Sequence, residues 1–151
     1  VAVTGDGSFQ LNIQELQTIV HYHLPVKLFI INNNGYLSIR QTQVRFFNSR
    51  LVGEGVHSGV SFPEISRIAQ AYGIKYVKLT CANLSKGLDQ VLKNNLPVIC
   101  EVVALENQPI IPTNTAEIGA NGVMVSKPLE DMYPFLDRKT FFSEMVIKPV
   151  G

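Results

Sequence analysis

Two long apolar runs limit the folds that this chain can adopt. The segments "VKLFIINN", which starts at Val26, and "LPVICEVVAL", which ends at Leu105, are mostly apolar and lack the polar alternation of a half-exposed strand. Continuous runs of this length are typical of parallel strands that are covered on both faces. They predict buried strands of a sheet that has helices on both sides.

Segments with helical periodicity lie between and around these runs. Apolar residues recur at helical spacing in residues 12–22, in "FPEISRIAQAYG" and in "NLSKGLDQVLKNN". A further strand, "IKYVKLT", lies between the last two, and Val1 to Val3 is interpreted as the end of another buried strand. This alternation predicts an α/β fold, a three-layer sandwich with a mainly parallel sheet.

The periodic pattern ends after Leu105. The remaining residues carry prolines at 109, 112, 128, 134 and 149 and predict only one short helix, near residues 138–145. We therefore expect an α/β domain over residues 1–105 and an irregular C-terminal arm over residues 106–151. Because Val1 begins inside a predicted strand without an initiator Met, we interpret the domain as N-terminally truncated.

The charge balance and the cysteine content argue against several classes of protein. Thirteen basic and twelve acidic residues leave a formal charge of +1, which gives no sustained field for nucleic acid or anionic membrane. No apolar run reaches the roughly 20 residues that cross a bilayer. Cys81 and Cys100 form no C-x-x-C pair, which favours reduced thiols in a cytoplasmic protein.

Two polar turns follow two of the predicted strands. The sequence GDGS (residues 5–8) follows the first strand, and NNN (residues 32–34) ends the second. Ligands of open α/β sheets bind at the carboxyl ends of the strands. If these two strands lie close together, Asp6 and Asn33 meet at one edge of the sheet.

The residues around Asp6 suit a phosphate group. Gly5 and Gly7 allow the backbone to turn sharply and to approach a ligand without a Cβ atom in the way. The amides of Gly7 and Ser8, at the start of the following helix, can face an anion.

A phosphate beside a carboxylate requires a cation between them. Mg²⁺ prefers oxygen ligands in octahedral array. Asp6 would supply a charged oxygen, Asn33 an amide oxygen and Gly35 a backbone carbonyl oxygen, with phosphate and water completing the shell. The sequence therefore predicts a metal site that holds a diphosphate.

These motifs resemble those of a known family. Gly5-Asp6-Gly7 followed by Asn32-Asn33 is similar to the cofactor motif of thiamine diphosphate-dependent enzymes. The longer stretch "GDGSFQLNIQELQTIVHYHLPVKLFIINNNGY" resembles the acetolactate synthase and pyruvate oxidase branch. The resemblance continues through "FPEISRIAQAYGI" and "PVICEVVA" and so covers the first 105 residues.

The resemblance implies a thiamine diphosphate-binding fold, the cofactors thiamine diphosphate and Mg²⁺, and a transferase or lyase. The reaction it implies is decarboxylation of a small 2-oxo acid and transfer of the resulting carbanion to an acceptor. It carries roles over to individual positions: metal ligands at Asp6, Asn33 and the carbonyl of Gly35, a diphosphate cradle at Gly7 and Ser8, and a turn beside the cofactor at Tyr36 and Leu37.

The resemblance also implies a partner. In this family the activating glutamate comes from a pyrimidine-binding domain of the same or a second subunit, so the catalytic residues are expected outside this chain. Glu15 lies on the helix after the cradle and does not replace that glutamate. We expect a cytoplasmic homodimer or tetramer in which this chain alone is half a site and inactive.

Two departures leave the substrates open. Thr42 stands where acetolactate synthases commonly place a tryptophan, and the tail "NGVMVSKPLEDMYPFLDRKTFF" resembles synthase-like proteins encoded with surface-polysaccharide pathways. The 2-oxo acid, the acceptor and a flavin bound elsewhere are therefore not specified.

The sequence leaves two other functions open. One is a haloacid-dehalogenase-like phosphotransferase with Asp6 as the nucleophile, although that family expects a second Asp where Ser8 stands. The other is a non-catalytic scaffold with the same fold.

Overall fold

The chain forms two compact units. The structure, a computed structural model, describes residues 1–118 and 121–148. The first unit is Val1–Gln108 and the second is Pro109–Gly151. The first holds a parallel sheet with helices, and the second holds a pair of short strands and one helix.

The sheet of the first unit has four parallel strands in the order β1-β2-β4-β3. The two apolar runs form its two central strands, which pair from Lys27 opposite Val98 to Asn32 opposite Val103. Central strands lose contact with water on both faces, which explains their apolar sequences. The strands are β1 (Ala2–Gly5), β2 (Lys27–Asn32), β3 (Lys75–Leu79) and β4 (Val98–Val103).

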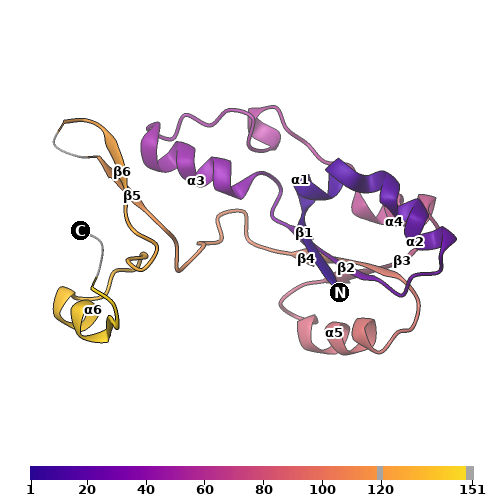
Figure 1. Ribbon diagram of the computed structural model, residues 1–151. Helices are drawn as coiled ribbons and strands as arrows, with labels where there is room; N and C mark the ends of the chain where they lie inside the picture. The colour runs from indigo at the N-terminus through magenta and orange to yellow at the C-terminus, as the bar shows by residue number, and fades with distance from the viewer. Residues whose placement is uncertain (119–120, 149–151) are drawn as a thin grey trace. The chain divides into compact units, whose positions relative to one another are not determined.

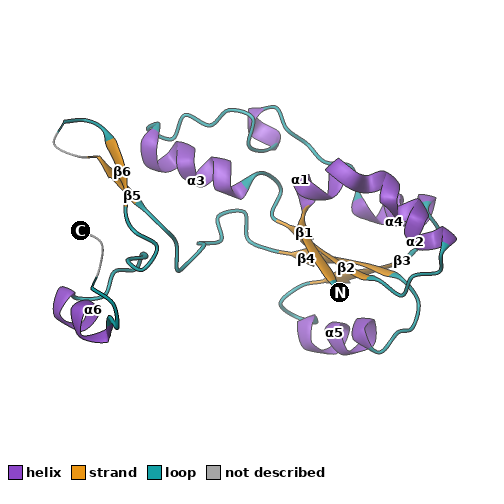
Figure 2. Ribbon diagram, in the orientation of Figure 1, coloured by secondary structure: helices purple, strands orange, loops and turns teal. Residues whose placement is uncertain are grey.

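Helices cover both faces of this sheet (Figure 1; Figure 2). On one face, Ile30 and Ile99 pack in a core with residues of α1 (Asp6–Phe9), α2 (Leu16–His21) and α4 (Ile65–Ala71). On the other face, Phe29 and Cys100 pack with Val91 of α5 (Leu84–Leu92). The predicted three-layer α/β sandwich with a parallel sheet is confirmed.

The N-terminal strand and the segment after it differ from the prediction. Val1 and Val3 were expected to be buried, but their exposed fractions are 83% and 67%, because β1 pairs only with β2 within the described residues. The helical segment starts at Asp6 rather than Asn12, and a 3₁₀ helix, η1 (Gln10–Glu15), joins α1 to α2. Asn12 interrupts it with φ −133° and ψ 32°.

Helix α3 (Leu37–Phe46) was not predicted. It carries no stripe of buried apolar residues, because Ile39 and Val44 are exposed and its buried side chain is Arg40. A periodicity argument cannot find such a helix. The loop that follows, expected over residues 48–61, contains a short 3₁₀ helix, η2 (Val56–Ser58).

The second unit is more regular than predicted. The helix expected near residues 138–145 is present as α6 (Arg138–Glu144), and the Asp137 carboxylate caps it by accepting a hydrogen bond of 3.1 Å from the Thr140 amide. The segment before it was expected to be irregular, but β5 (Ala116–Ile118) and β6 (Met124–Ser126) form an antiparallel pair. In the part of the chain that the structure describes, no helix has the length and apolar content to cross a membrane.

The two cysteines provide a test of this core. Cys100 is fully buried on β4, and burial raises the pKa of its thiol to about 11, whereas Cys81 is exposed. We expect an aromatic disulfide reagent at pH 8 to modify one thiol of the native chain rapidly and the second only after denaturation. Cys81→Ser should abolish the rapid phase. Two rapidly modified thiols in the native protein would contradict the packing described here.

Candidate functional site

The Asp6 carboxylate joins the ends of β1 and β2. Asp6 is only 3% exposed. Its Oδ1 accepts a hydrogen bond of 2.8 Å from the Gly7 amide, and its Oδ2 accepts bonds of 3.2 Å from the Asn33 amide and 3.1 Å from the Gly35 amide. The structure thus brings together the two polar turns that the sequence singled out.

The loop after β2 (residues 33–36, here called the metal loop after the metal ligands that the sequence predicts in it) has an unusual backbone. Asn34 has φ 57° and Gly35 has φ 154°, both in the region that residues with a side chain seldom adopt. A Cβ atom on Gly35 would lie 2.2 Å from the Glu54 carbonyl oxygen, so the position requires glycine. That carbonyl accepts a hydrogen bond of 2.7 Å from the Tyr36 amide, which holds the loop against residues 54 and 55.

Asn33 has a buried side-chain oxygen without a partner. Its side-chain Oδ1 is buried and accepts no hydrogen bond from any described residue. A buried polar atom of this kind is costly and requires an explanation, such as an ion that the atom binds. The atom belongs to the residue whose backbone amide donates to Asp6 Oδ2, directly after the end of β2.

The donor set fits Mg²⁺ in particular. Within residues 1–118 and 121–148, no three His, Cys, Asp or Glu side chains gather to hold a metal. A metal here would take oxygen ligands from the Asp6 carboxylate, the side-chain Oδ1 of Asn33 and a backbone carbonyl. Water and a bound anion would complete its shell. Mg²⁺ is commonly held in this way, by one or two carboxylates together with phosphate oxygens.

The glycines of the first turn have different surroundings. A Cβ atom on Gly7 would lie 2.3 Å from Cε1 of Tyr36, whereas one on Gly5 would meet nothing within 4 Å. Gly7 is therefore needed first for the close approach of the Tyr36 ring, which packs edge-to-face on Phe62 with centroids 5.5 Å apart. From the sequence, this glycine was predicted to serve a sharp turn and the approach of a ligand, and not the packing of a side chain of the same chain.

Two further predicted residues lie around this turn. Ser8 is exposed and lines a cavity of about 220 Å³ beside β1, together with Thr4 and Glu15. Leu37 is half-buried at the start of α3. The cofactor roles of Gly5, Gly7, Ser8, Tyr36 and Leu37 stay predictions.

A second cavity, also of about 220 Å³, lies against Asp6. Among its lining residues are Asn32, Tyr76 and Glu101, from three adjacent strands of the sheet. Glu101 is buried; its Oε1 accepts a hydrogen bond of 2.6 Å from Asn32 Nδ2, and its Oε2 accepts one from the Tyr76 hydroxyl. Burial and this carboxylate raise the pKa of Tyr76.

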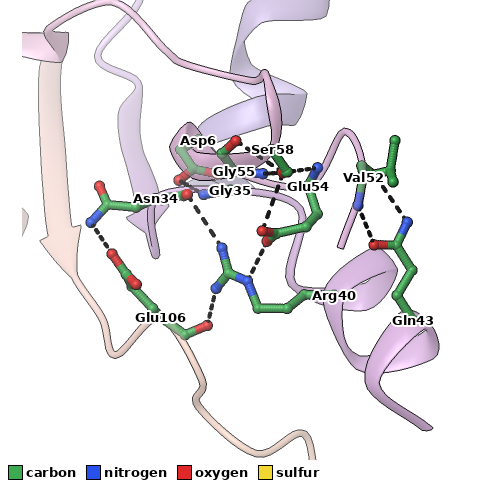
Figure 3. Close-up of polar contacts among 10 residues, drawn as sticks. All are labelled: Asp6, Asn34, Gly35, Arg40, Gln43, Val52, Glu54, Gly55, Ser58 and Glu106. Atoms are coloured by element: carbon green, nitrogen blue, oxygen red, sulfur yellow. Dashed lines mark hydrogen bonds and ion pairs between the residues drawn. The ribbon is translucent and has the colours of Figure 1, made fainter. Parts of the chain in front are cut away.

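Sequence reasoning missed three buried charged residues around this edge of the sheet, Glu101, Arg40 and Glu54. Glu101 could have been noticed as the acidic residue inside an otherwise apolar run. Arg40 forms a buried ion pair with Glu54 (Figure 3). It offered no comparable signal, because the helix that carries it was not predicted.

Comparison with known proteins assigns the chain to a family. The model described as "Thiamine pyrophosphate enzyme, C-terminal TPP binding domain" matches residues 1–102. The chain belongs to this family. The match confirms the predicted resemblance and fold, and at the level of the family it confirms the cofactor, thiamine diphosphate with Mg²⁺.

Acetolactate synthases are among the similar proteins. The chain is 33% identical over 130 residues to the acetolactate synthase large subunit of Porphyra purpurea, a match that covers 85% of this chain and 22% of that protein. It is 33% identical over 137 residues to the large subunit of Haemophilus influenzae, with 87% and 23% covered. It is also 33% identical over 132 residues to the isozyme 3 large subunit of Escherichia coli, with 84% and 22% covered. The chain spans about a fifth of the length of these curated relatives.

The two glycines of the first turn form a matched pair for mutation. Gly7→Ala should lower the free energy of unfolding by about 1–3 kcal/mol, because the added methyl group overpacks against the Tyr36 ring. Gly5→Ala should be neutral or slightly stabilising, because its Cβ atom meets open space. Denaturant titration measures both, and Gly7→Ala combined with Tyr36→Ala should remove the clash. Equal effects of the two single substitutions would contradict the observed packing.

Proposed function

We propose that this chain is the Mg²⁺- and diphosphate-binding domain of an acetolactate synthase-like enzyme, which decarboxylates a 2-oxo acid and joins the remaining carbon fragment to an acceptor. The observation that carries the proposal is the unpartnered, buried Asn33 Oδ1, which belongs to the residue whose backbone amide donates to the Asp6 carboxylate. Membership of the thiamine pyrophosphate family supports the assignment of Asn33 Oδ1 and the Asp6 carboxylate as ligands of Mg²⁺.

In this proposal each residue of the edge has a task. Asp6 supplies the negative charge that binds Mg²⁺, while Asn33 and the Gly35 carbonyl supply neutral oxygens, which limits repulsion against a diphosphate. The Ser8 amide faces the diphosphate, Gly7 brings the backbone close to it while its own amide donates to Asp6 Oδ1, and Tyr36 and Leu37 lie beside the cofactor. When bound, thiamine diphosphate supplies the electron sink for the decarboxylation, and the protein binds and orients it.

The proposal includes a second half of the site. We assign no proton transfer to Glu101, because both of its oxygens already accept hydrogen bonds from Asn32 and Tyr76. The activating glutamate would come from a pyrimidine-binding domain of the same or a second subunit, in a cytoplasmic homodimer or tetramer. No observation favours the phosphotransferase alternative.

Calorimetric titration of thiamine diphosphate into the complete natural polypeptide tests the metal site. Binding should require Mg²⁺, and Asp6→Asn should weaken it by at least about 10–100-fold, the range seen even for groups behind a metal ligand. Asn at this position still offers an oxygen to the Asn33 and Gly35 amides, so the loop should keep its fold. Glu15→Gln, an exposed acid in the same segment, is the control. Binding that is indifferent to Mg²⁺ or to Asp6→Asn would refute the proposal.

The 151-residue chain by itself should lack activity. We expect it to bind thiamine diphosphate weakly and to release no carbon dioxide from pyruvate, because half of the proposed site lies outside it. A coupled assay of carbon dioxide release, with the complete polypeptide as the positive control, measures this. Sustained turnover by the isolated chain would show that the site is complete within these residues.

A further inference from the structure

Arg40 is buried and contacts three separate segments of the first unit (Figure 3). Its exposed fraction is 8%, although it lies on the largely exposed helix α3. Its Nε pairs with the Glu54 carboxylate, its Nη1 donates to the Glu106 carbonyl, and its Nη2 donates to the Asn34 carbonyl at 3.4 Å. The fork of a guanidinium group suits such a junction, because it donates in several fixed directions.

The segments joined by Arg40 are those that hold the metal loop. The Asn34 carbonyl lies between the two proposed ligand residues, Asn33 and Gly35. Glu54 contributes its own backbone carbonyl to the Tyr36 amide. Glu106 also accepts a hydrogen bond of 2.9 Å from Asn34 Nδ2 through its side chain. Arg40 thus bonds the loop directly and also bonds both of the residues that support it.

Stability alone is a weak explanation for this ion pair. Taking a guanidinium and a carboxylate out of water costs free energy, and replacing a buried pair by apolar residues is often neutral or stabilising. The side chain of Glu54 is 5% exposed and that of Arg40 is 9% exposed, so both ions bear this cost. A role in fixing a particular geometry accounts for the pair better than a role in folding free energy does.

The metal loop has a geometry that needs such support. The positive φ angles of Asn34 and Gly35 correspond to sparsely populated backbone conformations. Conformations of this kind cost of order 1–3 kcal/mol for a residue with a side chain and persist only where the surroundings fix them. The Asp6 carboxylate holds the Asn33 and Gly35 amides, and the contacts from Glu54 and Glu106 hold the residues beside them, Tyr36 and Asn34.

We propose that Arg40 is a positioning residue for the metal: through Glu54, Glu106 and the Asn34 carbonyl it holds the metal loop in its ligand-binding conformation before the ion arrives. This inference rests on the proposed metal site, and it adds a group that does not touch the ion. Groups behind the ligands commonly control metal affinity by about 10–100-fold.

The test measures Mn²⁺ binding in the complete natural polypeptide with saturating thiamine diphosphate. Mn²⁺ takes the same oxygen ligands as Mg²⁺, and the electron paramagnetic resonance signal of the free ion reports its dissociation constant without any assay of activity. Arg40→Lys keeps the charge but lacks the fork, and Arg40→Met with Glu54→Met replaces the ion pair by apolar side chains. Both should raise the dissociation constant for Mn²⁺ by about 10–100-fold at temperatures where the protein is folded.

Arg138 provides the matched control. It too binds a buried carboxylate, Asp131, through two N–H groups at 2.9 Å each, and it donates to a backbone carbonyl, that of Leu136. It belongs to the second compact unit. Arg138→Met should lower thermal stability and leave the Mn²⁺ dissociation constant unchanged, which separates a loss of packing from a loss of positioning.

Three outcomes would overturn the inference. If the folded Arg40 variants bind Mn²⁺ as tightly as the parent, Arg40 has no positioning role. If neither variant folds, the Arg40–Glu54 pair is needed for the chain to fold, and its role is not the positioning of the metal loop. If the parent itself binds no Mn²⁺ with thiamine diphosphate, the proposed function fails together with the inference, whereas tight binding by the parent and both variants removes the inference alone.

Discussion

The arrangement of the candidate site depends on the three backbone amides that donate to the buried Asp6 carboxylate. A carboxylate that is removed from water must regain the hydrogen bonds it has lost. Asp6 finds them on its own turn, at Gly7, and on the loop after the neighbouring strand, at Asn33 and Gly35. The same charge therefore connects two strand ends and creates a negative point at the edge of the sheet.

Most of the polar groups discussed around this point have hydrogen-bond partners, and one does not. The Glu101 carboxylate accepts bonds from Asn32 and Tyr76, and the Arg40 guanidinium is bonded to Glu54 and to two carbonyl groups. The Asn33 Oδ1 stands out because it is buried and has no partner within the described residues. Glu101 and Arg40 already have partners and do not compete for Asn33 Oδ1. This oxygen is therefore suited to binding a cation.

Much of the architecture could be predicted because it follows from local pattern and burial. The apolar runs that contain Phe29 and Cys100 became the central strands of the sheet, and the helical face of Ile65, Ile68 and Ala69 became part of the core. Errors arose where tertiary contacts decide the structure. Helix α3 buries an arginine instead of an apolar stripe, and β1 is exposed because it pairs with only one strand among the described residues.

For the candidate site, the sequence by itself determined the residue types and their positions at the ends of strands: the Asp between two glycines, and the asparagines two dozen residues later. Spacing and the geometry of parallel sheets predicted that Asp6 and Asn33 meet if their strands lie close together, and the pairing of β1 with β2 meets that condition. Only the tertiary structure decided that Gly7 makes room for Tyr36, that Glu101 bonds Asn32, and that Arg40 bonds Glu54 and Glu106. These contacts join residues far apart in the chain through side chains that no periodicity constrains, so their partners are set by packing and not by local sequence.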